Sequence, residues 1–202
     1  ALLTFEGHGG EAVTCADWSP DGKRIVTCCG DGDALVWDPT TGEVLLTLDV
    51  EVEEGSWMTR AAWSPDGRRI TTYSEDTTGG RVWDASKGEV LLTFTGHTAS
   101  VFGLDWSATG ERLLTVSNDG TARIWDAGTG AELLSYSFGP QLTEGKWSPD
   151  MKQIALSAAD GKVRIVDVHW HTTDELIDYA RECCLLRQLT ADERELFGLP
   201  PR

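Results

Sequence analysis

Hydrophobic and polar residues alternate over short segments in residues 1–168 of this chain, and turn-forming residues separate these segments. The alternation has a period of two, which is the period of side chains on a β-strand with one buried face. The clearest predicted strands cover residues 24–28, 44–48, 69–73, 90–94, 112–116, 133–136 and 153–157. The pattern therefore predicts an all-β fold for residues 1–168.

Tryptophan spacing indicates that the predicted strands belong to a repeated unit. Four tryptophans are each followed by serine, at steps of 45, 43 and 41 residues: Trp18, Trp63, Trp106 and Trp147. Trp-Asp, or Val-Asp in the fourth unit, follows 19 or 20 residues later, at Trp37, Trp83, Trp125 and Val166. A unit of about 40 to 45 residues with four short strands is typical of a β-propeller blade, so the sequence predicts four blades.

Two dipeptides recur within this period. Gly-His precedes the first and third units, at Gly7-His8 and Gly96-His97, and Trp-Asp closes the first three. With this spacing, residues 1 to about 168 resemble the WD-repeat (WD40-type) family of β-propellers. The resemblance implies that a hydrogen-bonded tetrad of His, Ser or Thr, Asp and Trp braces a blade. Matched by position, the implied tetrads are His8, Thr27, Asp31 and Trp37 in the first unit and His97, Thr115, Asp119 and Trp125 in the third.

The other two units depart from the tetrad pattern. The second retains Thr72, Asp76 and Trp83 but has no histidine. The fourth retains only Asp160. We expect these two blades to depend on apolar packing instead of a polar network.

The two ends of the repeat region do not match. Residues 1–5 are similar to the fourth strand of a unit at 90–94, whereas a helix-like pattern replaces the fourth strand after Val166-Asp167. WD-type rings close by such an offset, so we expect residues 1–6 to form a strand that completes a neighbouring blade. Four blades are few for this family, and we therefore interpret the chain as part of a larger ring. The alternative is a homodimer in which two copies exchange first strands and form an eight-bladed ring.

Residues 169–202 are predicted to be a second domain, a helical tail that packs on the propeller. Thr172 and Glu175 make a capping box, and an apolar stripe at helical spacing follows it. The tail is similar to the ending of bacterial WD-repeat proteins in which a signalling or effector module precedes the propeller. That resemblance implies that the chain is the C-terminal part of a larger protein. A docking helix for a partner is the alternative interpretation of the stripe.

Charge narrows the range of partners. The chain has 33 acidic and 17 basic residues and a net charge of −16. Nucleic acids and anionic membranes bind through lysine and arginine, so we expect neither as a partner. Five cysteines lack the spacing of a metal site and are interpreted as thiols in a reducing compartment, with a cytoplasmic location. They are Cys15, Cys28, Cys29, Cys183 and Cys184.

Catalytic and metal-binding functions have weaker support. The histidine, threonine and aspartate residues recur at repeat-equivalent positions, whereas a catalytic triad needs one copy in one pocket. His169 and His171 could bind a metal ion from one side of a strand, but no third ligand lies at a useful spacing. Gly79-Gly80 is interpreted as a loop, because no phosphate-binding motif follows it. We expect no enzyme, no cofactor and no metal site.

Partner contacts are expected where the inner strands open toward one face of the propeller. One residue lies at that opening in each unit, four places before the Trp-Ser pair: Thr14, Thr59, Phe102 and Thr143. Phe102 is either an aromatic anchor for a partner or a side chain buried under a loop. The predicted function is a non-catalytic protein-interaction scaffold or sensing platform. Its rivals are a self-assembling structural propeller half and, less favoured, an enzyme with a site in the central pocket.

Overall fold

The computed structural model describes residues 3–30, 32–50, 58–74 and 79–168, without the side chains of Met58, Thr59 and Ser74. These residues form fifteen β-strands, and the described ranges contain no helix. The predicted all-β class is therefore confirmed for the repeat region. The expected helical tail, with His169 and His171, lies outside the described residues, as do Asp31 and Asp76.

Each unit predicted from the tryptophan spacing forms its own antiparallel sheet, called a blade below. Blade 1 contains β1 (Val13–Trp18), β2 (Ile25–Cys29), β3 (Asp33–Trp37) and β4 (Val44–Asp49). Blade 2 contains β5 (Met58–Trp63), β6 (Arg69–Ser74), β7 (Gly79–Asp84) and β8 (Val90–Thr95). Blade 3 contains β9 (Val101–Trp106), β10 (Arg112–Ser117), β11 (Thr121–Asp126) and β12 (Glu132–Ser137). Blade 4 contains β13 (Leu142–Trp147), β14 (Gln153–Ala158) and β15 (Val163–Asp167), without a fourth strand among the described residues.

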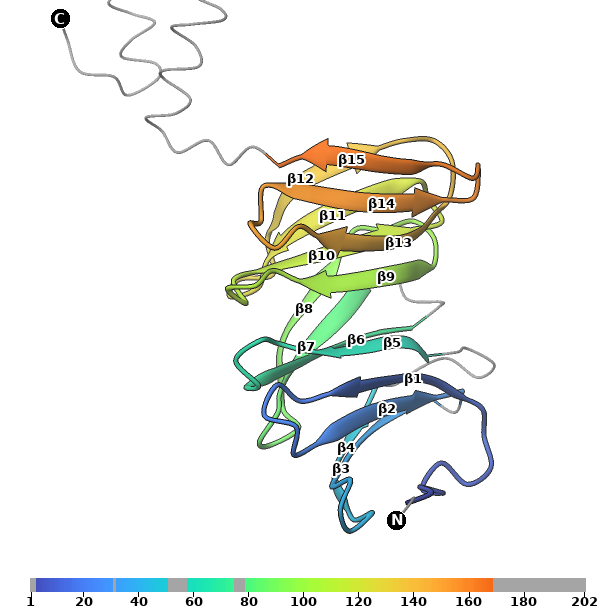
Figure 1. Ribbon diagram of the computed structural model, residues 1–202, viewed down its shortest axis with the longest axis vertical. Coiled ribbons are helices and arrows are strands. Elements are labelled where there is room, and N and C mark those ends of the chain that lie inside the picture. The colour runs from blue at the N-terminus through green and yellow to red at the C-terminus, as the bar shows by residue number, and fades with distance from the viewer. Residues whose placement is uncertain (1–2, 31, 51–57, 75–78, 169–202) are drawn as a thin grey trace, which may run out of the picture. The chain divides into compact units, whose positions relative to one another are not determined.

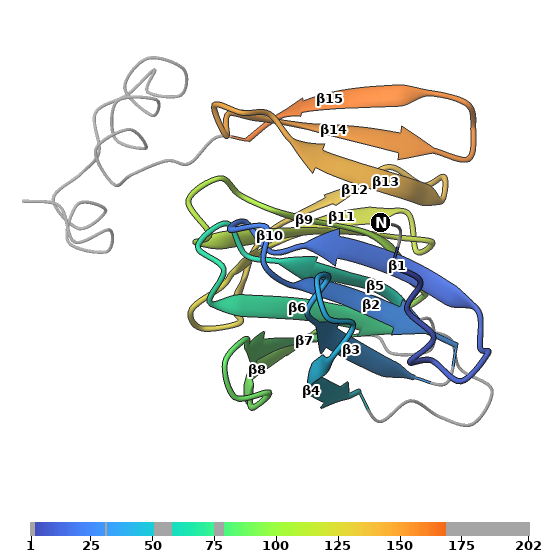
Figure 2. The same ribbon diagram turned by 60° about the horizontal axis from the view of Figure 1, so that its bottom comes forward.

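The hydrophobic core lies between successive blades. Figure 1 shows the first strands β1, β5, β9 and β13 side by side, and Figure 2 shows blade 2 running from β5 outward to β8. Between blades 1 and 2, Val26 and Leu48 belong to one buried cluster with Trp63. Between blades 2 and 3, Phe94 and Leu104 belong to another. Burying each such side chain contributes about 1.5–3 kcal/mol, so neighbouring blades stabilise one another.

A short turn joins the first and second strands of every blade. In blade 1 the Ser19 hydroxyl donates to Asp21 at 2.6 Å and accepts the Arg24 N–H at 2.9 Å. Gly22 ends this turn with a φ of 68°, in the left-handed region that glycine adopts at low cost. In blade 4 Met151 takes the glycine position with a φ of 59°. A residue with a Cβ is strained there by about 1 kcal/mol.

The interpretation of Gly79-Gly80 as a loop is wrong. Both residues begin strand β7, and Gly80 pairs with Tyr73 of β6. A Cβ added at Gly80 would lie only 2.5 Å from Cζ of the Tyr73 ring. The glycine is needed because the ring packs directly against the backbone, which the local sequence does not reveal.

Residues 3–6 belong to no strand among the described residues. Phe5 instead stacks on Trp37 of blade 1, with ring centroids 4.4 Å apart and ring planes 3° apart. Phe94 of β8 holds the matching repeat position, and its ring centroid lies 5.3 Å from that of Trp125 in the following blade. Phe5 therefore lies against Trp37 as Phe94, from the last strand of blade 2, lies against Trp125. Completion of a neighbouring blade by residues 1–6 stays a prediction.

Candidate protein-interaction site

Each first strand contains a β-bulge at the same place in the repeat. In blade 1, Val13 pairs with Cys29 and Cys15 pairs with Cys28, so the register skips Thr14. The same irregularity skips the matching residue of the other three blades: Thr59, Phe102 and Thr143. A bulge takes its extra residue out of the ladder and re-aims its side chain. The four residues expected to contact a partner are thus the four bulge residues.

The bulge residues differ in exposure. Thr14 and Thr143 are exposed, with their hydroxyl oxygens 3.4 Å from the Cys28 carbonyl oxygen and 2.9 Å from the Ser157 hydroxyl. Phe102 is half-buried. The side chain of Thr59 lies outside the described residues.

A pocket of about 480 Å³ opens between the first strands of the blades. Residues of β1, β5, β9 and β13 line it, and Thr14 contributes to its wall. Four of the lining residues carry charge: Asp17, Arg60, Asp105 and Lys146. A concave site with a few convergent polar groups is where a protein most often binds a ligand or a partner side chain.

Arg60 connects three blades across this pocket. Its Nε donates to the Phe102 carbonyl at 3.0 Å, and its guanidinium forms an ion pair with Glu144 of blade 4. Lys146 Nζ lies 2.9 Å from Asp105 Oδ1. The Arg60 and Lys146 side chains are 40% and 56% exposed, so both cations are accessible to a partner. Arg60 has no spacing signal in the sequence and was not predicted, because the repeat has unlike residues at its position.

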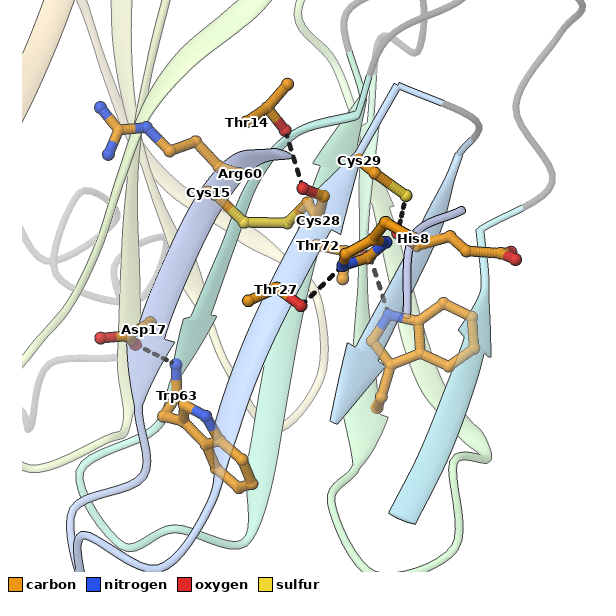
Figure 3. The surroundings of a disulfide bond; sticks show 12 residues. His8, Thr14, Cys15, Asp17, Thr27, Cys28, Cys29, Arg60, Trp63 and Thr72 are labelled. Atoms are coloured by element: carbon orange, nitrogen blue, oxygen red, sulfur yellow. Dashed lines mark hydrogen bonds between the residues drawn. A yellow bond between two sulfur atoms is a disulfide. The ribbon is translucent and has the colours of Figure 1, made fainter. Parts of the chain in front are cut away.

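A disulfide joins β1 and β2 beside the pocket, as Figure 3 shows. Cys15 and Cys28 lie directly opposite each other in the antiparallel register, with their Cα atoms 5.1 Å apart. This distance suits a disulfide. The interpretation of these two cysteines as thiols is therefore wrong. It failed because the register between two strands, and not the spacing in the sequence, decides which cysteines meet. Cys29 remains a buried thiol, and the expected cytoplasmic location stays a prediction.

The tetrad residues of blade 3 form one chain of hydrogen bonds. Trp125 Nε1 donates to Thr115 Oγ1 at 2.9 Å, and Thr115 Oγ1 lies 2.8 Å from His97 Nε2. His97 Nδ1 lies 2.9 Å from Asp119 Oδ2. Burial lowers the pKa of His97, although its hydrogen bond to Asp119 acts in the opposite direction. The imidazole is therefore neutral at pH 7. The network implies that Nδ1 carries the ring proton and donates it to Asp119, while Nε2 accepts a hydrogen bond from the Thr115 hydroxyl.

Asp119 is the charged end of this network. Partial burial by itself raises the pKa of Asp119, but its hydrogen bonds outweigh burial and lower the pKa to about 2. The Thr121 hydroxyl donates at 2.6 Å, the Thr98 N–H at 3.0 Å and the Thr121 N–H at 2.8 Å. The carboxylate therefore fixes the loop before β9 and the turn before β11 to the same point.

The other blades hold shorter parts of the network. In blade 1, His8 Nε2 lies 2.7 Å from Thr27 Oγ1, which also accepts the Trp37 Nε1 proton at 3.2 Å, while Asp31 is outside the described residues. In blade 2, Trp83 Nε1 donates to Thr72 at 2.8 Å. In blade 4, Asp160 instead pairs with Arg164 of β15 at 2.6 Å.

The arrangement supports binding better than catalysis. His8 and His97 belong to the tetrads, and among the described residues no histidine lines the pocket beside a candidate nucleophile. No group of three metal-ligating side chains occurs within the described ranges. A search of those same residues for a helix long and apolar enough to cross a membrane found none.

The WD domain, G-beta repeat family matches residues 1–38 and 88–126, the two segments that hold the histidine-bearing units. These two segments are therefore WD40 repeats. The second matched segment starts at the outer strand β8 and ends with β11 of the next blade. The WD40 repeat is therefore offset from the sheet by one strand, and each junction between blades lies inside a repeat.

The chain is similar to parts of longer proteins. The chain is 24% identical to the intraflagellar transport protein 80 homolog of Mus musculus over 98% of its own length and 28% of that protein. It is 31% identical to a guanine nucleotide-binding protein subunit beta of Zea mays over 75% of its length and 40% of that subunit. The chain thus spans less than half of these relatives.

A designed protein has the same architecture as the described blades. The crystal structure of the computationally designed Ika4 protein superposes with a TM-score of 0.71 at 25% identity, over 84% of this chain and 98% of that one. These relatives support WD40 blades as the fold. The expected resemblance to bacterial multidomain proteins stays a prediction, because the natural relatives named above are eukaryotic.

Proposed function

We propose that this chain is a non-catalytic scaffold that binds a protein partner at the pocket between its first strands. The observation that carries the proposal is the alignment of four equivalent bulges, two of them exposed threonines, along the strands that line this pocket. Arg60 and Lys146 add accessible cations, and the half-buried Phe102 is the bulge residue of blade 3. Arginine and aromatic residues dominate the energy of protein interfaces.

The relatives support a role in assemblies. By its name, the Zea mays relative is a subunit of a guanine nucleotide-binding protein, and another relative in Arabidopsis thaliana is a cofactor of the APC complex. We infer for this chain a part in a larger cytoplasmic signalling or effector assembly. Protein surfaces, and not nucleic acid or membrane, are the proposed partners, in keeping with the net charge of −16.

Site-specific photocrosslinking tests the proposal. A photoreactive amino acid replaces Thr14 at the pocket in one variant and Thr47 in a second. Both threonines are exposed strand residues of blade 1, but Thr47 lies on the outer strand β4. We expect a discrete crosslinked protein from the native source at Thr14 and not at Thr47, and its loss when Arg60 is changed to Glu. Equal crosslinking at both positions, or none at Thr14, would contradict a partner site at the pocket.

Self-assembly of two propeller halves is the second candidate function. The observation in its favour is β15, which lacks a partner strand on one side among the described residues and carries Val163 and Ile165 at 71% and 60% exposure. The matching residues of blade 3, Ala122 and Ile124, are fully buried. Analytical ultracentrifugation of the 202-residue chain distinguishes the candidates, because self-assembly requires a mass of about twice 22.0 kDa.

A further inference from the structure

An arginine clamp joins blade 1 to blade 2. The guanidinium carbon of Arg24 lies over the Trp63 ring, 4.5 Å from the ring centroid. The same guanidinium donates to the Ala85 carbonyl at 2.7 Å and to the Gly67 carbonyl at 3.2 Å. A planar cation held over an indole by two hydrogen bonds is specific for arginine, because lysine has neither the plane nor the fork of donors.

Blade 2 holds blade 3 by the same clamp. The guanidinium carbon of Arg69 lies 4.8 Å from the centroid of the Trp106 ring. Arg69 donates to the Ala127 carbonyl at 2.9 Å and to the Gly110 carbonyl at 2.6 Å. Each receiving blade therefore offers one indole face and two carbonyls at fixed repeat positions: the Trp of Trp-Ser, the glycine of the first turn and the residue after Trp-Asp. We call this set the guanidinium receptor.

Blade 1 carries a guanidinium receptor that no arginine of the described residues covers in this way. Its members are Trp18, the carbonyl of Gly22 and the carbonyl of Pro39. Trp18 is 55% exposed, whereas the receptor tryptophans Trp63 and Trp106 are 5% and 7% exposed. The surrounding strand β1 is open as well, since Val13 is 55% exposed and its equivalent Val101 is fully buried.

The turn of blade 1 is open at the same place. A Cβ added at Gly67 would lie 3.5 Å from Cδ of Pro20 in the preceding blade, and one at Gly110 would lie 3.6 Å from Cδ of Pro65. A Cβ added at Gly22 would meet no atom within 4 Å. The guanidinium receptor, the first strand and the first turn of blade 1 are therefore all uncovered, whereas a neighbouring blade covers their equivalents in blades 2 and 3.

Blade 4 of a second copy does not supply the missing groups. Gln153 holds the position of Arg24 and Arg69, and its amide donates to Asp167 of its own blade at 2.7 Å. Lys146 holds the position of Asp17 and Asp105. Each of those two aspartates accepts a hydrogen bond at 2.8 Å from the backbone N–H of the Trp-Ser tryptophan in the following blade, which an ammonium group cannot do.

We propose that the open face of blade 1, formed by Val13, Trp18, Gly22 and Pro39, docks a β-propeller blade that carries arginine at the start of its second strand. The guanidinium of that arginine covers Trp18 and donates to the carbonyls of Gly22 and Pro39. The docked blade therefore resembles blades 1 and 2 of this chain, which carry Arg24 and Arg69 at this position, and not blade 4, which carries Gln153.

Installing the missing arginine on blade 4 tests the proposal with a real blade as the probe. The variant Gln153→Arg gives one copy the donor that the receptor of another copy requires. Sedimentation velocity over a range of micromolar concentrations measures the association of the full 202-residue chain. We expect Gln153→Arg to strengthen head-to-tail association by about tenfold over the natural chain, from the cation–π and hydrogen-bond contacts of one buried clamp.

Two further variants separate the clamp from a gain of charge. Gln153→Lys adds the charge without the planar fork and is expected to associate like the natural chain. Trp18→Leu in the Gln153→Arg background is expected to abolish the gain, and because Trp18 is 55% exposed, the chain keeps its fold and melting temperature. Equal association of the Arg and Lys variants, or no effect of Trp18→Leu, would overturn the receptor. Tight dimers of the natural chain would overturn the assignment of the occupant, because blade 4 would then suffice without arginine.

Discussion

At the scale of single residues, Thr115 shows how a buried polar group stabilises a blade. Its side chain is fully buried, and its hydroxyl accepts from Trp125 while it donates to His97. A buried hydroxyl without partners costs about 1–3 kcal/mol, so each member of the chain of hydrogen bonds depends on the next. Asp119 is the last member of this series of hydrogen bonds, and its carboxylate accepts from the backbone N–H groups of Thr98 and Thr121.

Asp119→Ala is expected to lower the free energy of unfolding by about 1–3 kcal/mol at pH 7, since it leaves the His97 N–H and two backbone N–H groups without their acceptor. The folded-state pKa of Asp119, about 2, is below its unfolded value. Its contribution is therefore complete above about pH 4 and is lost as the pH falls toward 2. Urea unfolding from pH 7 to pH 3 measures both effects.

The matched control is Asp160→Ala, at the same repeat position in blade 4. Asp160 pairs with Arg164 on an exposed surface, and exposed pairs contribute about 0–1 kcal/mol. We expect a loss well below that of Asp119→Ala. Equal losses at the two positions would show that the network of blade 3 adds nothing beyond a surface ion pair.

At the scale of elements, register decides what the strands bring together. β1 and β2 pair so that Cys15 faces Cys28, and the bulge at Thr14 shifts the residues before it by one place. Without that shift the two cysteines would still meet, but Val13 would face another partner. The bulge thus separates the part of β1 that is covalently bonded to β2 from Val13 at the start of the strand.

Reduction of the Cys15–Cys28 disulfide is expected to lower the free energy of unfolding by about 3 kcal/mol, because the bond closes a short loop and restricts the unfolded chain. Guanidinium chloride unfolding with and without dithiothreitol measures the loss. The double variant Cys15→Ser with Cys28→Ser should show no response to the reductant from this loop. Peptide mapping after alkylation under denaturing conditions supplies the check: labelled Cys15 and Cys28 in unreduced protein would contradict the disulfide.

At the scale of the whole molecule, the blades are joined by unequal sets of contacts. Blade 1 holds blade 2 through the Arg24 clamp and through Asp17, which accepts a hydrogen bond from the backbone N–H of Trp63. Blade 2 has Ala62 at the matching position, so its junction with blade 3 lacks this carboxylate, and its polar contacts come from Arg69 and Arg60. In a stack where each blade contacts its neighbours, the weakest junction sets the cooperativity of unfolding.

Arg69→Ala is expected to uncouple blades 1 and 2 from blades 3 and 4, because this junction has no aspartate to replace the clamp. Differential scanning calorimetry should show a broadened or two-step transition, with a calorimetric enthalpy above the van't Hoff value. Arg24→Ala removes the equivalent arginine from a junction that keeps Asp17, and its transition should remain closer to two-state. A single sharp transition for Arg69→Ala would contradict the special weakness of the junction between blades 2 and 3.

The sequence alone determined the blades and the positions of their special residues. Period-two alternation and turn chemistry act over a few residues, so strand segments and four repeats were readable without coordinates. Counting back from each Trp-Ser pair also located the bulge residues, although nothing local showed that Thr14 or Phe102 would leave the ladder. The arginine clamp had a readable signal as well, since Arg24, Arg69 and Arg112 each follow a Trp-Ser tryptophan by six places.

Only the tertiary structure decided which distant groups meet. The Cys15–Cys28 bond depends on the register of two strands, and the contact of Gly80 with Tyr73 depends on how close a ring lies to a backbone. Arg60 reaches Glu144 because the first strands of three blades lie side by side. The exposure of Trp18 depends on which side of blade 1 has a neighbour. A repeat specifies each blade by local rules, whereas the contacts between blades depend on how separate sheets pack, and no local pattern encodes that.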